Sequence, residues 1–263
     1  MTPAATTAAA ASAARFPLGL ALLTVQREAR RDFAGTLARL AAMGYRELDM
    51  YPTDAGVDAP AARQALDAAG LTCVSSRVPV AVLSRGWERA LDAAATLGAR
   101  FVTLANVPPE ERPTPGDWDE LAELFARRGR EARARGLTFC YHHHAFEFVP
   151  AGGRTPFERL LAATAPDEVR LQVDVYWLRA AGRDPAAELR RLGNRVATLH
   201  LKDATPAPAS AITTVGRGTL DFRAVLDAAW AGGVRHAFVE EDAPADPLGS
   251  ARDAAAYLTA LGG

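Results

Sequence analysis

One pattern recurs along this chain: a short β-branched or aromatic run, a polar loop, and an alanine-rich amphipathic segment that ends at a glycine. The glycines that end these segments are Gly44, Gly70, Gly98, Gly136, Gly193 and Gly233. Neighbouring ends lie about 26 to 40 residues apart, the size of one βα unit, once a unit ending near Pro166 is counted. Strands and helices that alternate at this spacing predict a parallel sheet.

Eight segments are candidate strands, and eight parallel strands can close into a barrel. They are Leu18 to Leu23, Arg46 to Met50, Thr72 to Ser76, Phe101 to Ala105, Thr138 to His142, Arg170 to Val173, Val196 to His200 and His236 to Glu240. The helices expected between them include Phe33 to Met43, Pro60 to Ala69, Trp87 to Leu97, Trp118 to Arg135 and Phe222 to Ala231. We therefore expect an α/β protein with a single (β/α)8 TIM barrel as its catalytic domain, residues 16–263, preceded by a flexible, disordered tail, residues 1–15. A doubly wound open sheet is the alternative, but Leu18 to Glu28 lacks the Gly-rich phosphate turn typical of that fold.

The composition narrows the classes of partner. Lysine plus arginine, 30 residues, nearly cancels aspartate plus glutamate, 31 residues, so no uniform field favours nucleic acid or an anionic membrane. No apolar run approaches the roughly 20 residues of a membrane span, and the first 15 residues lack the pattern of a secretory signal. Cys73 and Cys140 lie in apolar runs and are expected to be small buried residues rather than a disulfide. These features predict a cytoplasmic protein.

In a barrel of this type, the residues at the C-terminal end of each strand surround the active site. In the first half of the chain those positions hold Glu47, Asp49, Arg77 and Asn106. In the second half they hold His142, His143, His144, Glu147, Asp174, Tyr176, Trp177, His200, Lys202, Asp203, Glu240, Glu241 and Asp242. His236, at the opposite end of its strand, is expected to be a surface or packing residue.

Carboxylates and imidazoles at the ends of successive strands predict a site for one divalent metal ion. Oxygen and nitrogen donors without thiolate fit Mn²⁺, Mg²⁺, Co²⁺, Fe²⁺ or Zn²⁺, and ligand type does not choose among them. The alternative is a set of ion pairs that caps the barrel mouth, although converging acidic groups repel one another unless a cation is present. Strand alternation sends His142 and His144 to one face and His143 to the other.

Two further segments indicate how a substrate is held. Tyr176 and Trp177 follow an acid that closes an apolar strand, and aromatic rings pack well on the apolar faces of sugars. Lys202 lies on the same strand face as His200, which places a cation beside a metal ligand unless Lys202 is an exposed loop lysine.

Taken together, these motifs resemble the sugar phosphate isomerase/epimerase superfamily, the xylose isomerase-like barrels that also include inosose dehydratases and endonuclease IV. The resemblance covers nearly the whole chain after the tail. It rests on Leu18-Gly19-Leu20, Glu47-Leu48, Tyr141-His142-His143-His144, Phe146-Glu147-Phe148, Asp174-Val175-Tyr176-Trp177, His200-Leu201-Lys202-Asp203, Gly216 to Asp221 and Val239-Glu240.

The resemblance implies one divalent ion bound by a residue of the fifth strand segment together with Asp174, His200 and Glu240. Many relatives have glutamate at the position of His142, whereas the nearest carboxylate here is Glu147, so the fifth-strand ligand is either residue and we expect Glu147. Arg77 replaces a frequent histidine, and Arg217 replaces a frequent acidic residue.

The resemblance implies an isomerase or epimerase that acts on a keto sugar or sugar derivative through proton abstraction and a metal-stabilised enediolate. Glu147 and Glu240 would act as bases, His142 or His144 would protonate an oxygen, and Lys202 would hold a negative oxygen or phosphate. The expected substrate-binding residues are Glu47, Arg77, Asn106, Tyr176, Trp177 and Lys202.

Three alternatives remain at this point. The same site would support a dehydratase or lyase of the inosose dehydratase or 3-keto-glycoside-cleaving type. A non-catalytic sugar-binding barrel is a second alternative, and a homo-oligomer is compatible with either. An endonuclease of the IV type is disfavoured by five histidines and a net charge of −1. The expected partner is a small carbohydrate, not a nucleic acid or a membrane.

Overall fold

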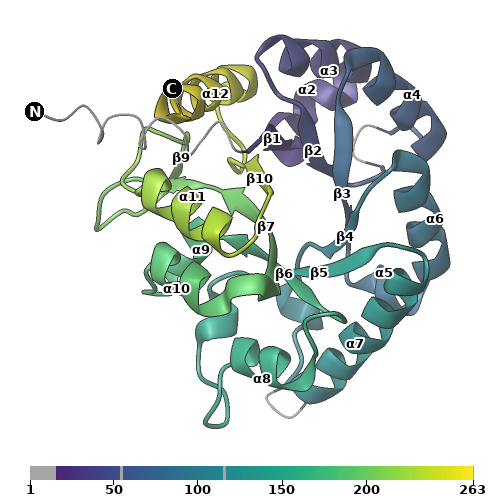
Figure 1. The fold of residues 1–263 in the computed structure, drawn as a ribbon, viewed down its shortest axis with the longest axis vertical. Helices are drawn as coiled ribbons and strands as arrows, with labels where there is room; N and C mark the ends of the chain where they lie inside the picture. Colours follow the sequence, from purple (N-terminus) through teal and green to yellow (C-terminus); the bar gives the residue numbers. More distant parts are fainter. Residues whose placement is uncertain (1–15, 54–55, 115–116, 263) are drawn as a thin grey trace, which may run out of the picture.

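The computed structural model describes residues 16–53, 56–114 and 117–262. Within them, eight parallel strands close into a barrel in the order β1-β10-β7-β6-β5-β4-β3-β2 (Figure 1). The barrel strands are β1 (Leu18–Ala21), β2 (Glu47–Met50), β3 (Thr72–Val78), β4 (Phe101–Leu104), β5 (Thr138–His142), β6 (Arg170–Asp174), β7 (Val196–Leu201) and β10 (His236–Val239). The closed barrel predicted from the repeating pattern is confirmed, and the open-sheet alternative is wrong. The tail expected at residues 1–15 lies outside the described residues.

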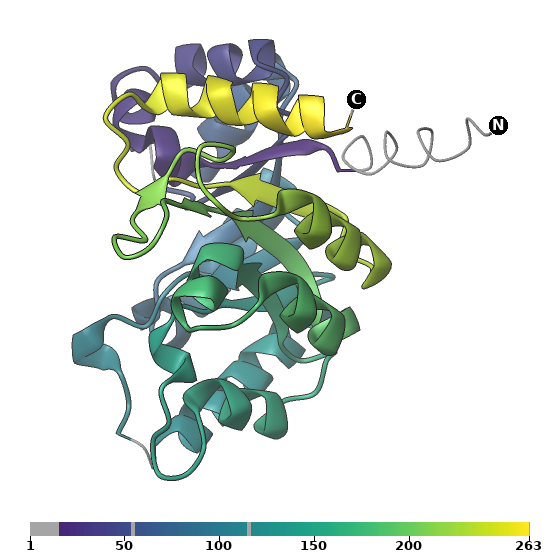
Figure 2. The same ribbon diagram turned by 90° about the vertical axis from the view of Figure 1, so that its left-hand side faces the viewer.

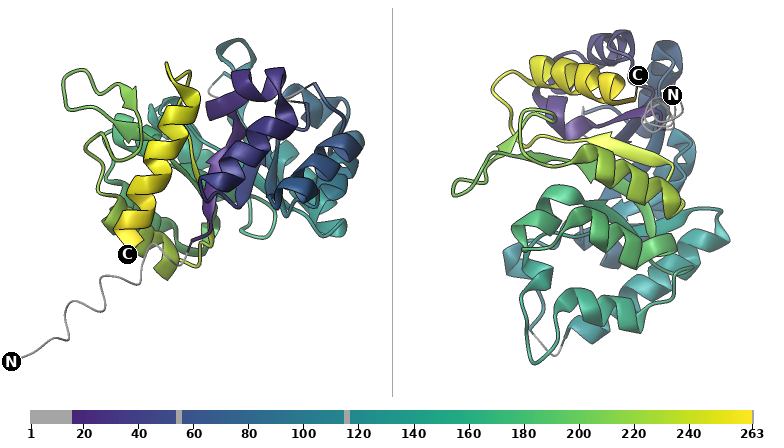
Figure 3. Two further views of the ribbon diagram at one scale, coloured as in Figure 1. Left: turned by 90° about the horizontal axis from the view of Figure 1, so that it is seen from above. Right: turned by 60° about the vertical axis from the view of Figure 1, so that its left-hand side comes forward.

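Helices follow the strands and surround the barrel (Figures 1 and 2). The longer ones are α3 (Phe33–Ala42), α4 (Ala59–Ala69), α6 (Trp87–Leu97), α7 (Trp118–Ala134), α8 (Pro156–Ala163), α10 (Pro185–Leu192), α11 (Phe222–Ala231) and α12 (Pro247–Gly262). Shorter turns of helix are η2 (Leu22–Val25), α2 (Gln26–Arg31), α5 (Ala81–Ser84), η3 (Pro109–Glu111), η4 (Phe146–Phe148), α9 (Val175–Ala180) and η5 (Gly193–Arg195). The C-terminal helix α12 lies beside β1 (Figures 2 and 3). No helix in the described part of the chain is both long enough and apolar enough to cross a membrane.

Local sequence explains where many helices begin. Helices α3, α4, α10 and α11 each follow an aspartate whose carboxylate accepts a hydrogen bond from the backbone N–H three residues on. Helix α8 begins with a capping box, in which Thr155 and Glu158 satisfy each other's backbone N–H groups. These caps hold the helices in place around the strands.

The barrel has two apolar layers. Side chains on the outer face of the strands pack against the helices in one large cluster, which includes Leu48, Leu104 and Tyr141. The barrel interior holds a separate, small cluster made of Ala21, Val74, Phe101, Cys140, Ala197 and Phe238. Both cysteines are buried and free, as expected. Because successive side chains alternate between these layers, inward-facing residues beyond the interior cluster meet at the C-terminal mouth.

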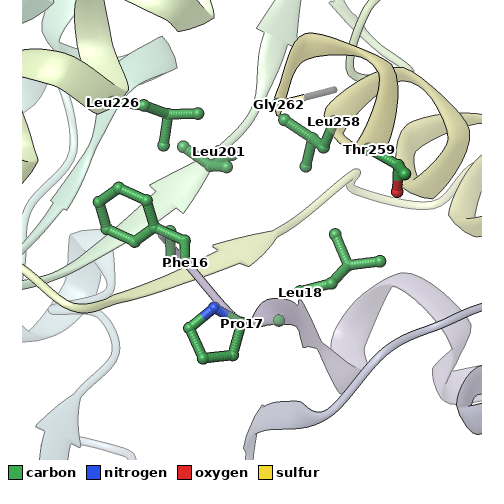
Figure 4. Close-up of a pocket in the computed structure, with 10 residues that line it drawn as sticks. Phe16, Pro17, Leu18, Leu201, Leu226, Leu258, Thr259 and Gly262 are labelled. Atoms are coloured by element: carbon green, nitrogen blue, oxygen red, sulfur yellow. The ribbon is translucent and has the colours of Figure 1, made fainter. Parts of the chain in front are cut away.

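Two features of the fold were not expected from the sequence. The loop after β7 contains a short antiparallel pair, β8 (Asp203–Ala204) and β9 (Ile212–Thr213). A pocket of about 330 Å³ lies between the first strand and helices α11 and α12, and Phe16, Leu226 and Leu258 line it (Figure 4). Its lining is almost entirely apolar, so it offers no catalytic or metal-binding group.

Candidate metal centre and active site

Four buried side chains from neighbouring strands meet at the C-terminal mouth. His142 ends β5, Asp174 ends β6, His200 lies on β7, and Glu240 directly follows β10. One nitrogen or oxygen atom from each lies within 4.8 Å of the atoms offered by the other three. Two imidazoles and two carboxylates at this spacing are suited to hold one divalent cation.

Hydrogen bonds orient the donor atoms of this group, which we call the ligand cluster. Nδ1 of His142 lies 3.0 Å from Oε1 of Gln172, an acceptor, so this nitrogen carries the proton and Nε2 keeps its lone pair. Oδ1 of Asp174 accepts the backbone N–H groups of Tyr176 and Trp177 at 2.9 and 3.2 Å. Its buried Oδ2 makes no hydrogen bond within the described residues. A buried carboxylate oxygen that makes no hydrogen bond fits a metal ligand.

Two cations lie against Glu240. Nη1 of Arg77 is 2.8 Å from Oε1 of Glu240, and Nζ of Lys202 is 2.9 Å from Oε2. Lys202 also lies 3.5 Å from Oδ2 of Asp174 and 3.0 Å from Oδ1 of Asp242. Although burial raises the pKa of Glu240, Lys202, His200 and Arg77 outweigh it and hold that pKa well below its usual range. Glu240 is therefore ionised and is a poor proton acceptor.

The two imidazoles of the ligand cluster differ in charge. Burial and the neighbouring His200 lower the pKa of His142 well below its usual range, so this ring is neutral. Burial also lowers the pKa of His200, but Glu240 and Asp49 together raise it to about 9. In the chain alone, a proton on His200 thus balances the buried carboxylates. A divalent cation at the ligand cluster would take the place of this proton.

Aromatic rings form one wall of the mouth. The ring centroid of His144 lies 4.9 Å from that of His142 and 5.2 Å from that of Trp177. Nζ of Lys202 lies 5.6 Å from the Trp177 ring centroid, and Tyr176 packs edge-on against the same indole. Nδ1 of His144 and Nε1 of Trp177 are buried and make no hydrogen bond within the described residues. Both atoms are thus available to polar groups of a substrate.

The strand-five histidines alternate as expected. His142 and His144 face the mouth, whereas the buried His143 lies in the helix layer against Phe148 and Phe157. His143 is therefore a packing residue.

Glu147 does not join the ligand cluster, although we expected it as the fifth-strand ligand. Its Oε1 accepts a 2.6 Å hydrogen bond from the Tyr141 hydroxyl, and its Oε2 accepts one of 2.8 Å from the backbone N–H of His144. Burial raises the pKa of Glu147 to about 7, while these two hydrogen bonds oppose the shift. The structure brings His142 into the cluster in its place.

Glu47 and Arg217 lie away from the ligand cluster. Glu47 is the first residue of β2, at the opposite end of the barrel, where Oε2 lies 2.9 Å from Nδ1 of His236. Glu47 therefore cannot reach a substrate at the mouth. Asn106 is exposed in the loop after β4. Arg217 forms an ion pair with Asp253 of α12.

The sequence placed Asp49 and Asp203 at strand ends without giving them a role, and it did not single out Gln172. Asp49 lies 2.7 Å from His200, and Gln172 orients His142. Gln172 lies two residues before the inward-facing Asp174, so strict alternation along β6 could have found it. Asp203 accepts backbone N–H groups from Ala204, Gly216, Gly218 and Leu220. Asp203 thus holds the loop between β7 and α11, a role that no strand periodicity indicates.

Comparisons with known proteins agree with this architecture. A family model described as the xylose isomerase-like TIM barrel matches residues 37–261. An inosose dehydratase of Geobacillus thermodenitrificans is 30% identical over 167 residues, which are 55% of this chain and 55% of that protein. The chain therefore spans about half the length of the curated relatives it matches.

Solved structures share the whole barrel. A sugar phosphate isomerase/epimerase from Parabacteroides distasonis superposes with a TM-score of 0.79 at 25% identity, covering 92% of this chain and 93% of that one. The IOLI protein, solved with a zinc atom bound, superposes with a TM-score of 0.74 at 13% identity, covering 94% of this chain and 98% of that one. At that identity the second likeness concerns the fold alone. Since the family model spans seven of the eight barrel strands, this chain belongs to the xylose isomerase-like TIM barrel family.

Proposed function

We propose that this chain is a divalent-metal-dependent isomerase or epimerase that acts on a keto sugar or a sugar derivative. The observation that carries the proposal is the buried ligand cluster of His142, Asp174, His200 and Glu240, with donor atoms within 4.8 Å of one another. The similarity to a sugar phosphate isomerase/epimerase supports the same class of substrate. We further propose that residues 16–263 form the catalytic domain and that the protein is cytoplasmic. A homo-oligomer is compatible with this function.

The cofactor in this proposal is one divalent ion. Mixed imidazole and carboxylate ligands suit Mn²⁺, Co²⁺, Fe²⁺ or Zn²⁺, and Mg²⁺ less well because it prefers oxygen ligands. When bound, the ion would supply a Lewis acid that polarises a substrate carbonyl and makes the adjacent C–H acidic.

His144 is the residue best placed to move a proton. Burial, together with Lys202, lowers its pKa to about 3, so the ring is neutral and has a free lone pair at neutral pH. A negative substrate oxygen beside the ring would raise this pKa. Its Nδ1 makes no hydrogen bond within the described residues. Both carboxylate oxygens of Glu240 already pair with Arg77, Lys202 and His200. The Glu147 carboxylate accepts the backbone N–H of His144 and does not reach the ligand cluster. His144 would therefore take the proton from the carbon beside the carbonyl and deliver it to the former carbonyl carbon, while the hydroxyl proton moves to the former carbonyl oxygen.

Trp177, Tyr176 and Lys202 would bind the substrate. The Trp177 and Tyr176 rings offer apolar surface at the mouth for one face of a sugar ring. The Lys202 ammonium is buried beside this surface and would donate a hydrogen bond to a negative oxygen. Arg77 is also buried and forms an ion pair with Glu240. Its positive charge would keep the Glu240 carboxylate ionised.

A second function is favoured by one observation, the match to inosose dehydratases. In that reaction the same C–H proton would be removed first. The C–O bond at the β-position would then break, and the abstracted proton would pass to the leaving hydroxyl or glycosyl oxygen, which departs as water or an alcohol. The residues of the site serve either outcome, because both begin with proton abstraction beside a carbonyl.

Proton NMR in D2O tests the proposal and separates the two functions. The chain is loaded with Mn²⁺ or Zn²⁺, freed of excess metal and incubated with keto sugars, keto inositols and 3-keto glycosides; the protein and its metal are removed before the spectra are recorded. Deuterium incorporation or a changed stereocentre without loss of a group supports the isomerase or epimerase. An unsaturated or shortened product assigns the dehydratase or lyase. Neither result with any substrate class, at full metal occupancy, would argue for the non-catalytic barrel.

A further inference from the structure

Asp49 reaches across the barrel mouth to one member of the ligand cluster. Its Oδ2 lies 2.7 Å from Nε2 of His200, and both side chains are fully buried. Asp49 comes from β2 and His200 from β7, two strands that are separated in the barrel by β1 and β10. The contact is therefore made through the barrel interior and not between neighbouring strands.

This contact determines which nitrogen of His200 faces the cluster. A carboxylate is an acceptor only, so in the chain alone both ring nitrogens of His200 carry a proton, Nε2 beside Asp49 and Nδ1 beside Glu240. An ion bound by Glu240 would displace the Nδ1 proton, and because Asp49 keeps Nε2 protonated, the lone pair would lie on Nδ1. Nδ1 is the nitrogen on the cluster side, 2.9 Å from Oε2 of Glu240.

Arg77 holds Asp49 and Glu240 in a fixed relation. Its Nε lies 3.8 Å from Oδ2 of Asp49, while its Nη1 lies 2.8 Å from Oε1 of Glu240. The guanidinium is planar and rigid, so these two contacts fix the distance between the carboxylates. His200 is bounded by the same two carboxylates, one at each ring nitrogen.

We propose that Asp49 is the positioning residue that makes His200 a metal ligand through Nδ1. A carboxylate that accepts the second N–H of a metal-binding histidine fixes the ring orientation and raises the basicity of the ligating nitrogen. Asp49 itself does not touch the ion. This inference rests on the proposed metal site and adds a residue to it.

The chain contains a matched control on the same strand. Glu47, two residues before Asp49, pairs with Nδ1 of His236 at 2.9 Å. This carboxylate–histidine pair lies at the opposite end of the barrel from the ligand cluster. Glu47→Gln and Asp49→Asn thus remove the same charge from the same strand, and only Asp49→Asn touches a proposed ligand.

The first measurement is metal affinity by competition with a chromophoric chelator, using Zn²⁺ and Co²⁺. Asp49→Asn should weaken binding about 10- to 100-fold, the range seen when partners of metal-binding histidines are lost. Glu47→Gln should bind as tightly as the unsubstituted chain. Equal affinity for all three proteins would overturn the role of Asp49. If the unsubstituted chain binds neither ion, the proposed function fails, and this inference fails with it.

The second measurement uses the unsubstituted protein, so it does not depend on the folding of a variant. Long-range ¹H–¹⁵N NMR of the zinc-loaded chain reports the state of each imidazole nitrogen, and five histidines make the spectrum tractable. His200, assigned from the nuclear Overhauser contacts between its ring and the Phe238 ring, should show Nε2–H and a zinc-bound Nδ1. Zinc on Nε2 of His200 would overturn the inference while leaving the metal site intact.

Discussion

The hydroxyl of Tyr141 donates a 2.6 Å hydrogen bond to Glu147, whose second oxygen accepts the backbone N–H of His144 at 2.8 Å. This arrangement uses both carboxylate oxygens of Glu147 to hold the turn after β5. Glu147 therefore positions His144 and is not available to the ligand cluster.

Substitution of His142, but not of Glu147, should lower the metal content. Glu147→Gln should keep one ion per chain, because glutamine can still pair with the Tyr141 hydroxyl and sits outside the cluster. His142→Ala should lose most of the ion, because it removes one of four donors. Elemental analysis of both proteins checks this. An empty Glu147→Gln protein beside a loaded His142→Ala protein would reverse the assignment.

The free energy of unfolding should carry a pH dependence from Glu147. Burial raises the pKa of this carboxyl from 4.5 to about 7, so the folded chain binds more protons than the unfolded chain between those values. The resulting stability is complete below pH 4.5 and is lost as pH rises through 7, by about 3 kcal/mol for a shift of this size. Urea unfolding in the presence of a chelator, with Glu147→Gln as reference, measures it. A difference between the two proteins that is constant from pH 5 to 8 would contradict the buried, protonatable carboxyl.

Replacing His144 should affect turnover without affecting the ion. His144→Gln should reduce turnover by roughly 10² to 10⁴-fold, the contribution of one positioned acid or base. Its metal affinity should stay near that of the unsubstituted chain, because His144 is not a member of the cluster. His143→Gln serves as the neighbouring control, since His143 faces the helix layer. Comparable loss of turnover in both variants at equal stability would remove the special role of His144.

The loop held by Asp203 should not tolerate a side chain at Gly218. A Cβ at this position would clash with the Asp203 carboxylate and the Ala204 carbonyl. Gly218→Ala should therefore lower the free energy of unfolding by about 3 kcal/mol, through overpacking and disturbed hydrogen bonds to Asp203. Gly232→Ala is a suitable control, because the nearest atom to its Cβ, the Ala229 carbonyl oxygen, would lie 3.4 Å away, at ordinary contact distance. Thermal unfolding that is unchanged in Gly218→Ala would refute the close approach.

The fold could be predicted from the sequence because its signals are local and repeated. The expected strand at Thr138 to His142 and the expected helices at Trp87 to Leu97 and Phe222 to Ala231 have the observed bounds. Apolar periodicity and terminal glycines specify such elements directly. The β8–β9 pair was missed because a two-residue strand has too few positions to show a period.

The site was harder to predict because it depends on register. Glu47 and Asp49 face the same way, yet β2 begins at Glu47, so only Asp49 reaches the mouth. The sequence pattern marks a strand but not which of its inward residues is last. Glu147 was misplaced for a different reason, since the short helical turn Phe146–Phe148 directs its carboxylate back to Tyr141. Loop conformation of this kind leaves no periodic signal.

The number of metal ions bound per chain, compared between the unsubstituted chain and a variant that lacks one proposed ligand, tests the central claim most directly. The unsubstituted chain and Asp174→Asn are purified without chelator, incubated with Mn²⁺, Co²⁺ or Zn²⁺, passed over a desalting column and analysed for metal. We predict about one ion per unsubstituted chain and much less in Asp174→Asn, because Oδ2 of Asp174 is the cluster oxygen without a hydrogen bond in the described residues. A metal content near zero in the unsubstituted chain with all three ions would contradict the account.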